Sequence, residues 1–274
     1  MKAVGYLGPE GTFSHLVARK RFGSGSRLVP CAGIYDVFEF IKGGRNRLGV
    51  LPLENSTGGT IFETIDCLVA HAGTLQIREE LSLNVKLALV GRKGEPVRTL
   101  YSHYVPLQHC QAWIRRSLHG VAVRETRSTA AAAEKAASEP GAAALATRDA
   151  ARRYGLDVLQ FPVQTDAPNI TEFIVVGPSG RPNPRSSKTS LLVMLENRPG
   201  SLFDFLGAFK RANVNLTRLV SRPIVGQPKS YLFVVDLQGH PRQPRVATAL
   251  EEARLAARRM DLLGVYPVRR MYAS

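Results

Sequence analysis

The chain has 274 residues, 44% of them hydrophobic, which suits one large or two modest domains with a proper core. Its net charge of +15 admits nucleic acid as a partner, but the arginines are scattered without a dense basic run, so we favour an arginine-rich background that attracts small anionic substrates. No apolar run reaches the roughly 18 residues of a membrane span, and the first residues lack the apolar stretch of a signal peptide.

Strands and helices are predicted to alternate through the first two thirds of the chain, which is typical of an α/β domain. We expect strands at residues 2–7, 27–32, 47–53, 75–91 (one or two strands), 99–103, 121–128, 142–147, 156–161 and 170–177. We expect helices at residues 14–22, 35–44, 61–72, 106–118, 129–141 and 148–155. Thr60 and Glu63 have the spacing of a capping box at the third of these helices.

A change of composition predicts a second domain. Residues 178–188 contain three Pro, three Ser and no apolar residue, which is typical of a linker. After it we expect strands at residues 189–196, 215–224, 230–239 and 262–270, and helices at residues 201–212 and 244–260. This βαββαβ order is the ferredoxin-like layout. We therefore predict domains at residues 1–178 and 189–274, joined by a linker at residues 179–188.

Two polar turns follow strands of the first domain. GPEGTFS, residues 8–14, is a glycine turn before a helix, where Thr12 or Ser14 caps the helix or helps to hold an anion. LPLENSTGG, residues 51–59, follows a buried strand, and ligands of α/β folds bind where strands end. Helix capping alone explains the first turn better, whereas it explains the second turn only as well as ligand binding does.

The cysteines and histidines do not form a metal-binding pattern. Cys31, Cys67 and Cys110 are widely spaced without a CxxC pair, so we predict neither a disulfide framework nor a zinc site. His103 and His109 lie near Cys110, but with the wrong spacing for a zinc finger. This pattern fits a reducing cytoplasm, where we expect the protein to work without a metal.

Several stretches together resemble the prephenate dehydratase family in order and spacing. They are GPEGTFS, LPLENSTGGTIFETIDCL, STAAAAEKAASEPGAAALATRDAARRYGLDVL and NITEF. NRPGSLFDFLGAFKRANVNLTRLVSRP resembles the regulatory ACT domain that usually follows. The resemblance implies a catalytic domain like type II periplasmic binding proteins, with two α/β lobes around a cleft, and an attached ACT domain.

The resemblance also implies a reaction, in which prephenate loses carbon dioxide and water to give phenylpyruvate in phenylalanine biosynthesis. Aromatisation drives this reaction without a cofactor, and a general acid protonates the departing hydroxyl. The expected catalytic residues are Thr171 as the acid, with Asn55 and Ser56. The expected substrate-binding residues are Thr12, Ser14, Glu54, Thr57, Glu172 and Phe173.

The ACT domain implies that phenylalanine is an allosteric effector. ACT domains commonly pair side by side and bind an amino acid at the shared interface, so we expect a homodimer or a dimer of dimers. Backbone N–H groups at a helix start suit the effector's carboxylate. The expected effector residues are Asn197, Pro199, Gly200, Ser201, Leu202, Ser221, Arg222 and Pro223.

Two departures from the family pattern bear on function. Glu172 stands where the family has an arginine, and Val220 stands where the ACT motif has a glutamate, which predicts weaker phenylalanine binding. If Glu172 faced the dianionic substrate at about 4 Å, repulsion in place of attraction would cost several powers of ten in efficiency. We then expect Glu172→Arg to raise efficiency by about two powers of ten or more.

Other functions stay open at this point. Arogenate carries an ammonium group that Glu172 could pair with, so an arogenate dehydratase is one alternative. A catalytically impaired, phenylalanine-sensing paralogue is another, and a solute-binding module is suggested by the fold alone.

Overall fold

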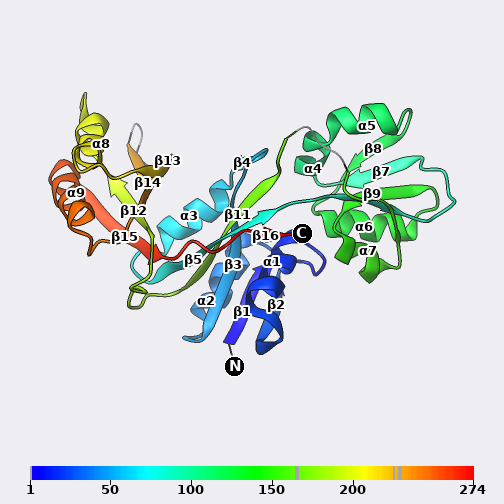
Figure 1. The fold of residues 1–274 in the computed structure, drawn as a ribbon, viewed down its shortest axis with the longest axis horizontal. Helices are drawn as coiled ribbons and strands as arrows, with labels where there is room; N and C mark the ends of the chain where they lie inside the picture. The colour runs from blue at the N-terminus through cyan, green and yellow to red at the C-terminus, as the bar shows by residue number, and fades with distance from the viewer. Residues whose placement is uncertain (1, 164–166, 225, 228–229) are drawn as a thin grey trace. The chain divides into compact units, whose positions relative to one another are not determined.

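The computed structural model describes residues 2–163, 167–224, 226–227 and 230–274. They form two compact units (Figure 1). Unit 1 comprises Met1–Phe62, Leu81–Phe173 and Arg270–Ser274, and unit 2 comprises Glu63–Glu80 and Ile174–Arg269. Among the described residues, no helix is long and apolar enough to cross a membrane.

The first sheet has seven strands, in the order β16-β5-β11-β3-β1-β2, with β4 paired to β3. The strands are β1 (Lys2–Leu7), β2 (Ser26–Cys31), β3 (Arg47–Asn55), β4 (Gly59–Thr60), β5 (Leu75–Asn84), β11 (Ile170–Pro178) and β16 (Tyr272–Ala273). β1 is parallel to both β2 and β3, so the C-terminal ends of these three strands lie at one edge. Helices α1 (Phe13–Phe22) and α2 (Ile34–Lys42) contact these parallel strands.

Helix α1 is defined by its ends. Thr12 is its N-cap, where the side-chain oxygen accepts a hydrogen bond of 3.2 Å from the backbone N–H of His15. Its last turn carries Arg19, Lys20 and Arg21, whose charges complement the helix dipole. The helix therefore begins at the glycine turn, as the sequence predicts, and η1 (Gly23–Gly25) follows it.

The second sheet of unit 1 has five strands, in the order β10-β6-β9-β7-β8. They are β6 (Ala88–Gly91), β7 (Thr99–Ser102), β8 (Ala122–Glu125), β9 (Ala142–Ala146) and β10 (Asp157–Gln160). Helices α4 (Tyr104–His109), α5 (Gln111–Ser117), α6 (Thr129–Ser138) and α7 (Arg148–Tyr154) accompany it. All five residues of β9 are buried, and alanines of α6 pack against them, so small side chains let helix and sheet approach closely.

Unit 2 contains a four-stranded antiparallel sheet, in the order β13-β14-β12-β15. Its elements are β12 (Lys188–Met194), α8 (Ser201–Arg211), β13 (Leu216–Pro223), β14 (Tyr231–Gln238), α9 (Pro244–Ala256) and β15 (Arg259–Tyr266). Helices α8 and α9 lie beside this sheet (Figure 1), and their apolar residues share one core with β12 and β14. This arrangement confirms the predicted ferredoxin-like domain.

Several predicted elements differ from the observed ones. Thr60 does not cap α3 (Phe62–Ala70), because Thr60 pairs with Glu54 across β3 and β4. The helix predicted at residues 106–118 is divided at Cys110, where ψ is 10°. The helix predicted to reach residue 260 ends at Ala256, because Arg259 already pairs with Met194 in the sheet.

The compact units assign two short segments differently from the predicted domains. Residues 270–274, predicted as part of the second domain, belong to unit 1, where Tyr272 pairs with Leu83. Residues 63–80, predicted as part of the first domain, belong to unit 2. The sequence pattern identifies elements but gives no sign of this exchange of short segments.

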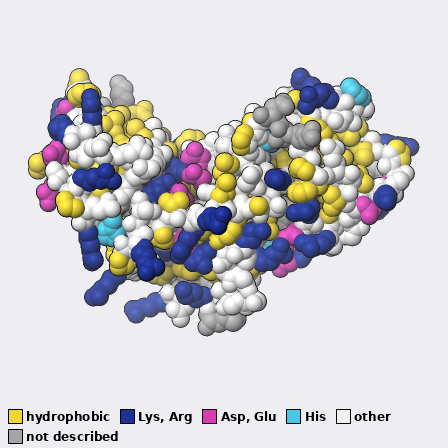
Figure 2. Space-filling model, in the orientation of Figure 1, with side chains coloured by type: hydrophobic (Ala, Val, Ile, Leu, Met, Phe, Trp, Pro, Cys, Tyr) yellow, Lys and Arg dark blue, Asp and Glu magenta, His cyan; other side chains and the backbone are white. Residues whose placement is uncertain are grey.

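The basic side chains are spread over the visible face of the protein (Figure 2). Several small groups of Lys and Arg lie among apolar and uncharged polar side chains, instead of forming one continuous patch. This distribution is consistent with the background interpretation of the +15 charge.

Candidate active site

A cavity of about 520 Å³ opens in unit 1 at the ends of several strands. Its lining comes from the turn between β1 and α1, the ends of β2 and β3, the start of α4, the turn before α6, and β11. Elements that accompany both sheets of unit 1 therefore contribute to it. This position matches the expectation that the ligand lies in a cleft between two α/β lobes.

Asn55 organises the polar side of the cavity. Its Oδ1 accepts hydrogen bonds from the backbone N–H groups of Thr57 (2.9 Å) and Gly58 (2.8 Å), which fixes the orientation of the carboxamide. Its Nδ2 is then directed toward β11, where it donates to Asn169 Oδ1 and to Thr171 Oγ1, each at 2.8 Å. The carboxamide thus uses both its oxygen and its nitrogen within the protein.

This contact leaves the Thr171 hydroxyl in a defined state. Thr171 is 9% exposed and lines the cavity, and its oxygen accepts the Asn55 bond. A hydroxyl that accepts one hydrogen bond still has its own proton to donate. No described residue is a recorded acceptor for that proton, so it is available to a ligand in the cavity. An N–H group aimed at the same oxygen also stabilises negative charge that develops there.

Thr12, Ser14 and Phe173 line the cavity together with Asn55 and Thr171. The Thr12 hydroxyl donates to the carbonyl oxygens of Pro9 (2.9 Å) and Leu7 (3.1 Å) while it caps α1. Thr12 therefore shapes the turn, and its proton is already used. Ser14 is 6% exposed, in the first turn of α1.

Other expected site residues do not line this cavity. Ser56 is hydrogen-bonded to the backbone around the start of β11. Its Oγ donates to the Pro168 carbonyl (3.1 Å) and accepts from the Ile170 N–H (3.0 Å). Thr57 Oγ1 contacts His109 Nδ1 of α4 at 3.0 Å. Both residues hold elements around the cavity in place. Glu54, the residue before Asn55, pairs with Thr60 between β3 and β4.

Glu172 also lies outside the cavity lining. Thr171 and Phe173 are both buried and both line the cavity, whereas Glu172 between them is half-buried and does not. Alternate side chains of a strand point to opposite faces of the sheet. The regular geometry of β11 thus directs Glu172 away from Thr171.

Charge within the cavity is concentrated on a residue that the sequence analysis did not select. Burial lowers the pKa of His103, so its imidazole is neutral near pH 7, and burial raises the pKa of the Cys31 thiol, which stays protonated. Arg127 is then the one charged group among the described lining residues. It lies next to Ser128 and Thr129 at the start of α6, which also line the cavity.

Comparison with known proteins agrees with this geometry. The prephenate dehydratase family model matches residues 4–181, and the ACT domain model matches residues 189–255. The chain belongs to the prephenate dehydratase family. A bifunctional chorismate mutase/prephenate dehydratase of Aquifex aeolicus is 35% identical over 266 residues, covering 96% of this chain and 73% of the relative.

Two solved structures are similar along nearly the whole chain. Prephenate dehydratase from Arthrobacter aurescens in complex with L-Phe has a TM-score of 0.86 and 29% identity, covering 97% of this chain and 89% of that one. GqqA, described as a novel type of quorum quenching acylase, has a TM-score of 0.86 and 28% identity, covering 98% of each chain. The shared fold extends through both the dehydratase and ACT regions.

A second cavity, of about 330 Å³, lies in the ACT region of this prephenate dehydratase family member. Asn197, Ser201 and Leu202 line it, and Gly200 precedes α8 with a φ of 84°, a conformation that favours glycine. Pro199 and Gly200 shape the turn without being part of the lining. The expected effector residues of this turn are thus brought together.

The other expected effector residues lie on β13, Leu216–Pro223. Ser221 and Pro223 are not part of the described lining of this cavity. Arg222 forms a two-pronged ion pair with Asp66, in which Nε and Nη2 donate at 2.7 and 2.6 Å. Asp66, on α3, was not among the expected residues.

Proposed function

We propose that the cavity of unit 1 binds prephenate and that Thr171 is the general acid of its decarboxylating dehydration. The ring carboxylate leaves as carbon dioxide, its bonding electrons complete the aromatic ring, and the C4 hydroxyl departs as water after taking a proton. Phenylpyruvate is the other product. The Asn55 to Thr171 hydrogen bond of 2.8 Å carries this proposal, because it leaves the Thr171 proton for the departing hydroxyl.

An assay of phenylpyruvate release from prephenate tests the function directly. We expect saturable turnover by the purified protein, and activity that survives treatment with a chelator, because the described residues contain no group of three or more metal-binding side chains. Absence of turnover would favour the impaired, phenylalanine-sensing alternative. Faster turnover of arogenate than of prephenate would favour an arogenate dehydratase. The three free cysteines suit the reducing cytoplasm in which we place the reaction.

Arg127 is the cation that we expect to hold a carboxylate of the substrate. Arg127→Ala should raise KM for prephenate about tenfold, because a hydrogen bond to a charged group contributes about 1.5–3 kcal/mol and the side chain is exposed. Steady-state kinetics measures this, with Arg124→Ala as the matched control, since Arg124 is exposed on β8 and outside the cavity lining. Equal KM values for the two variants would contradict this role.

The position of Glu172 on β11 favours a smaller effect of Glu172→Arg on prephenate turnover than the sequence alone predicts. Because Thr171 and Phe173 occupy the cavity face, we expect Glu172→Arg to change kcat/KM for prephenate by less than about tenfold, as for a substitution outside the site. The measurement compares parent and variant with both prephenate and arogenate. A gain of about two powers of ten in kcat/KM for prephenate would instead indicate that the charge at position 172 acts on the substrate.

Phenylalanine is the effector that we propose for the second cavity, at the turn formed by residues 197–202. Gly200→Asp should abolish phenylalanine binding in calorimetry, because it adds a negative charge beside the expected carboxylate and strains a position with a φ of 84°. Unchanged binding would indicate that phenylalanine binds at another site.

We also propose that two ACT domains pair side by side in a homodimer, which sedimentation of the protein tests.

GqqA supports a second candidate function, because it is described as a quorum quenching acylase and its structure matches 98% of this chain. Acyl transfer commonly uses a hydroxyl activated by an adjacent base. In the described part of this cavity, no recorded hydrogen bond joins a lining hydroxyl to His103, so the geometry favours the dehydratase. Release of an acyl group from an N-acylated amine, at a rate that Thr171→Ala leaves unchanged, would support a separate acylase activity.

A further inference from the structure

Unit 1 has another polar cavity, of about 430 Å³, and its lining is strongly positive. Five cationic side chains surround it: Arg19, Lys20, Lys86, Arg148 and Arg152. Asp149 is the one acidic side chain among its described lining residues, so the cations exceed it by four. The excess stays at three or more whatever charge Ser274 carries. This basic cavity shares no lining residue with the substrate cavity.

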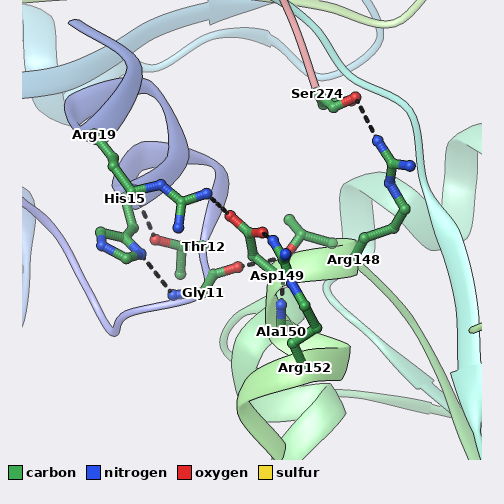
Figure 3. A network of polar contacts seen from close by, with 10 residues as sticks. Gly11, Thr12, His15, Arg19, Arg148, Asp149, Ala150, Arg152 and Ser274 are labelled. Carbon is green, nitrogen blue, oxygen red and sulfur yellow. Dashed lines mark hydrogen bonds and ion pairs between the residues drawn. The ribbon is translucent and has the colours of Figure 1, made fainter. Parts of the chain in front are cut away.

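The cations come from separate elements that meet around this cavity. Arg19 and Lys20 lie on α1, Arg148 and Arg152 lie on α7, and Lys86 lies in the connection from β5 to β6. Figure 3 shows Asp149 between Arg19 and Arg152, and both guanidinium groups form ion pairs with its carboxylate. The acid thereby organises two cations and does not neutralise the other three.

Two further contacts fix the position of Arg148. Its guanidinium carbon lies 3.9 Å from the centre of the Phe161 ring, a cation–π geometry. Its Nη2 donates to the Ser274 carbonyl at 3.5 Å, and Figure 3 shows the side chain extended toward that residue. Stacked, planar guanidinium groups match the oxygen atoms of phosphate well.

The lysines of the basic cavity are less committed. Lys20 and Lys86 are exposed, and no described residue forms a recorded ion pair with either ammonium group. Cations that line one cavity repel one another, and a bound anion offsets this repulsion. A ligand with two or more negative charges would relieve this repulsion and satisfy the free donors.

We propose that the basic cavity is a binding site for a small phosphate-bearing anion, separate from the substrate and effector sites. Phosphate groups combine multiple charge with three acceptor oxygens each, which suits mixed Arg and Lys donors. The site contacts both α1 and α7, and Thr147, next to Arg148, donates to the Gly11 carbonyl at 2.7 Å. A bound anion would thus link the two helices beside an existing contact between them.

Calorimetric titration of the whole protein tests this proposal. We expect one pyrophosphate per chain to bind, more tightly than inorganic phosphate, in a buffer held at constant ionic strength with potassium chloride. ADP forms a third arm: tighter binding than pyrophosphate identifies a nucleotide as the ligand, and equal binding identifies the phosphate groups alone. The double variant Lys20→Ala/Lys86→Ala should weaken pyrophosphate binding about tenfold or more.

The control is Arg115→Ala/Arg116→Ala, which removes two exposed cations from α5 of the same unit. We expect its affinity for pyrophosphate to equal that of the parent. Equal losses in both double variants would show a non-specific charge effect and overturn the site, as would a parent protein that binds no pyrophosphate. Since the readout is binding, the result does not depend on the dehydratase reaction.

Discussion

Thr171→Ala should lower kcat for prephenate by about 10²- to 10⁴-fold, the usual contribution of a positioned general acid. KM should change little, because a group that acts only in the transition state contributes little to substrate binding. The physical reason lies in the hydroxyl: its oxygen accepts the Asn55 amide bond and its proton is left for the substrate. Alanine removes both functions.

Two companion variants make this result interpretable. Thr171→Ser keeps the hydroxyl and should retain most of the activity, whereas a purely steric role for the Thr171 methyl group would make the Ser variant as slow as the Ala variant. Thr74→Ala removes an exposed threonine that donates to the His71 carbonyl at 2.9 Å, and should turn over at the parent rate. Parent-like kcat in Thr171→Ala would exclude Thr171 as the acid.

The sequence analysis selected Thr171, Glu172 and Phe173 together, although strand periodicity separates the middle residue from the other two. A buried strand over residues 170–177 requires side chains to alternate, so Thr171 and Phe173 share one face and Glu172 takes the other. The observed strand, Ile170–Pro178, keeps this alternation. What the sequence could not decide is which face meets the cavity, because that depends on where β11 pairs in the sheet.

Arg127 illustrates a residue that local patterns do not reveal. It precedes the Ser128 cap of α6, and in the sequence it follows three other arginines, Arg115, Arg116 and Arg124, from which no local pattern distinguishes it. Its position at the cavity results from the packing of the second sheet of unit 1. The available signal was the Ser-Thr pair at a predicted helix start, where backbone N–H groups commonly bind anions.

The fold was predicted well where each element buries its own apolar pattern. The βαββαβ order of the ACT region is of this kind, since each helix presents a stripe to one sheet. The short strand β16 was not predicted, because its two residues carry no periodicity and depend on pairing with β5. Likewise Glu80 reads as one more charge in an alternating strand, although it is 4% exposed.

The burial of Glu80 is explained by a group of charged side chains inside unit 2. Lys188 Nζ lies 2.6 Å from Glu80 Oε2 and 3.5 Å from Asp236 Oδ2, and Arg218 contacts Asp236 at 2.5 Å. Each of these four residues is at most 8% exposed. Ser190 adds a hydrogen bond to Asp236, also at 2.5 Å. The two cations and two anions balance, so removing one member alone leaves an uncompensated charge in a buried setting.

Lys188→Ala should therefore lower the free energy of unfolding by about 3–5 kcal/mol, because it leaves Glu80 and Asp236 with too little positive charge in a buried setting. Lys42→Ala is the matched control: Lys42 forms an ion pair of similar length, 2.8 Å, with Glu39, but both side chains are exposed, so its loss should lower the free energy of unfolding far less. Urea denaturation of both variants measures the difference.

The double variant Lys188→Met/Glu80→Gln should recover part of the loss, since it removes one cation together with one anion. If Lys188→Ala unfolds at the same urea concentration as Lys42→Ala, the buried charges are hydrated or compensated in solution, and the charge balance does not stabilise unit 2.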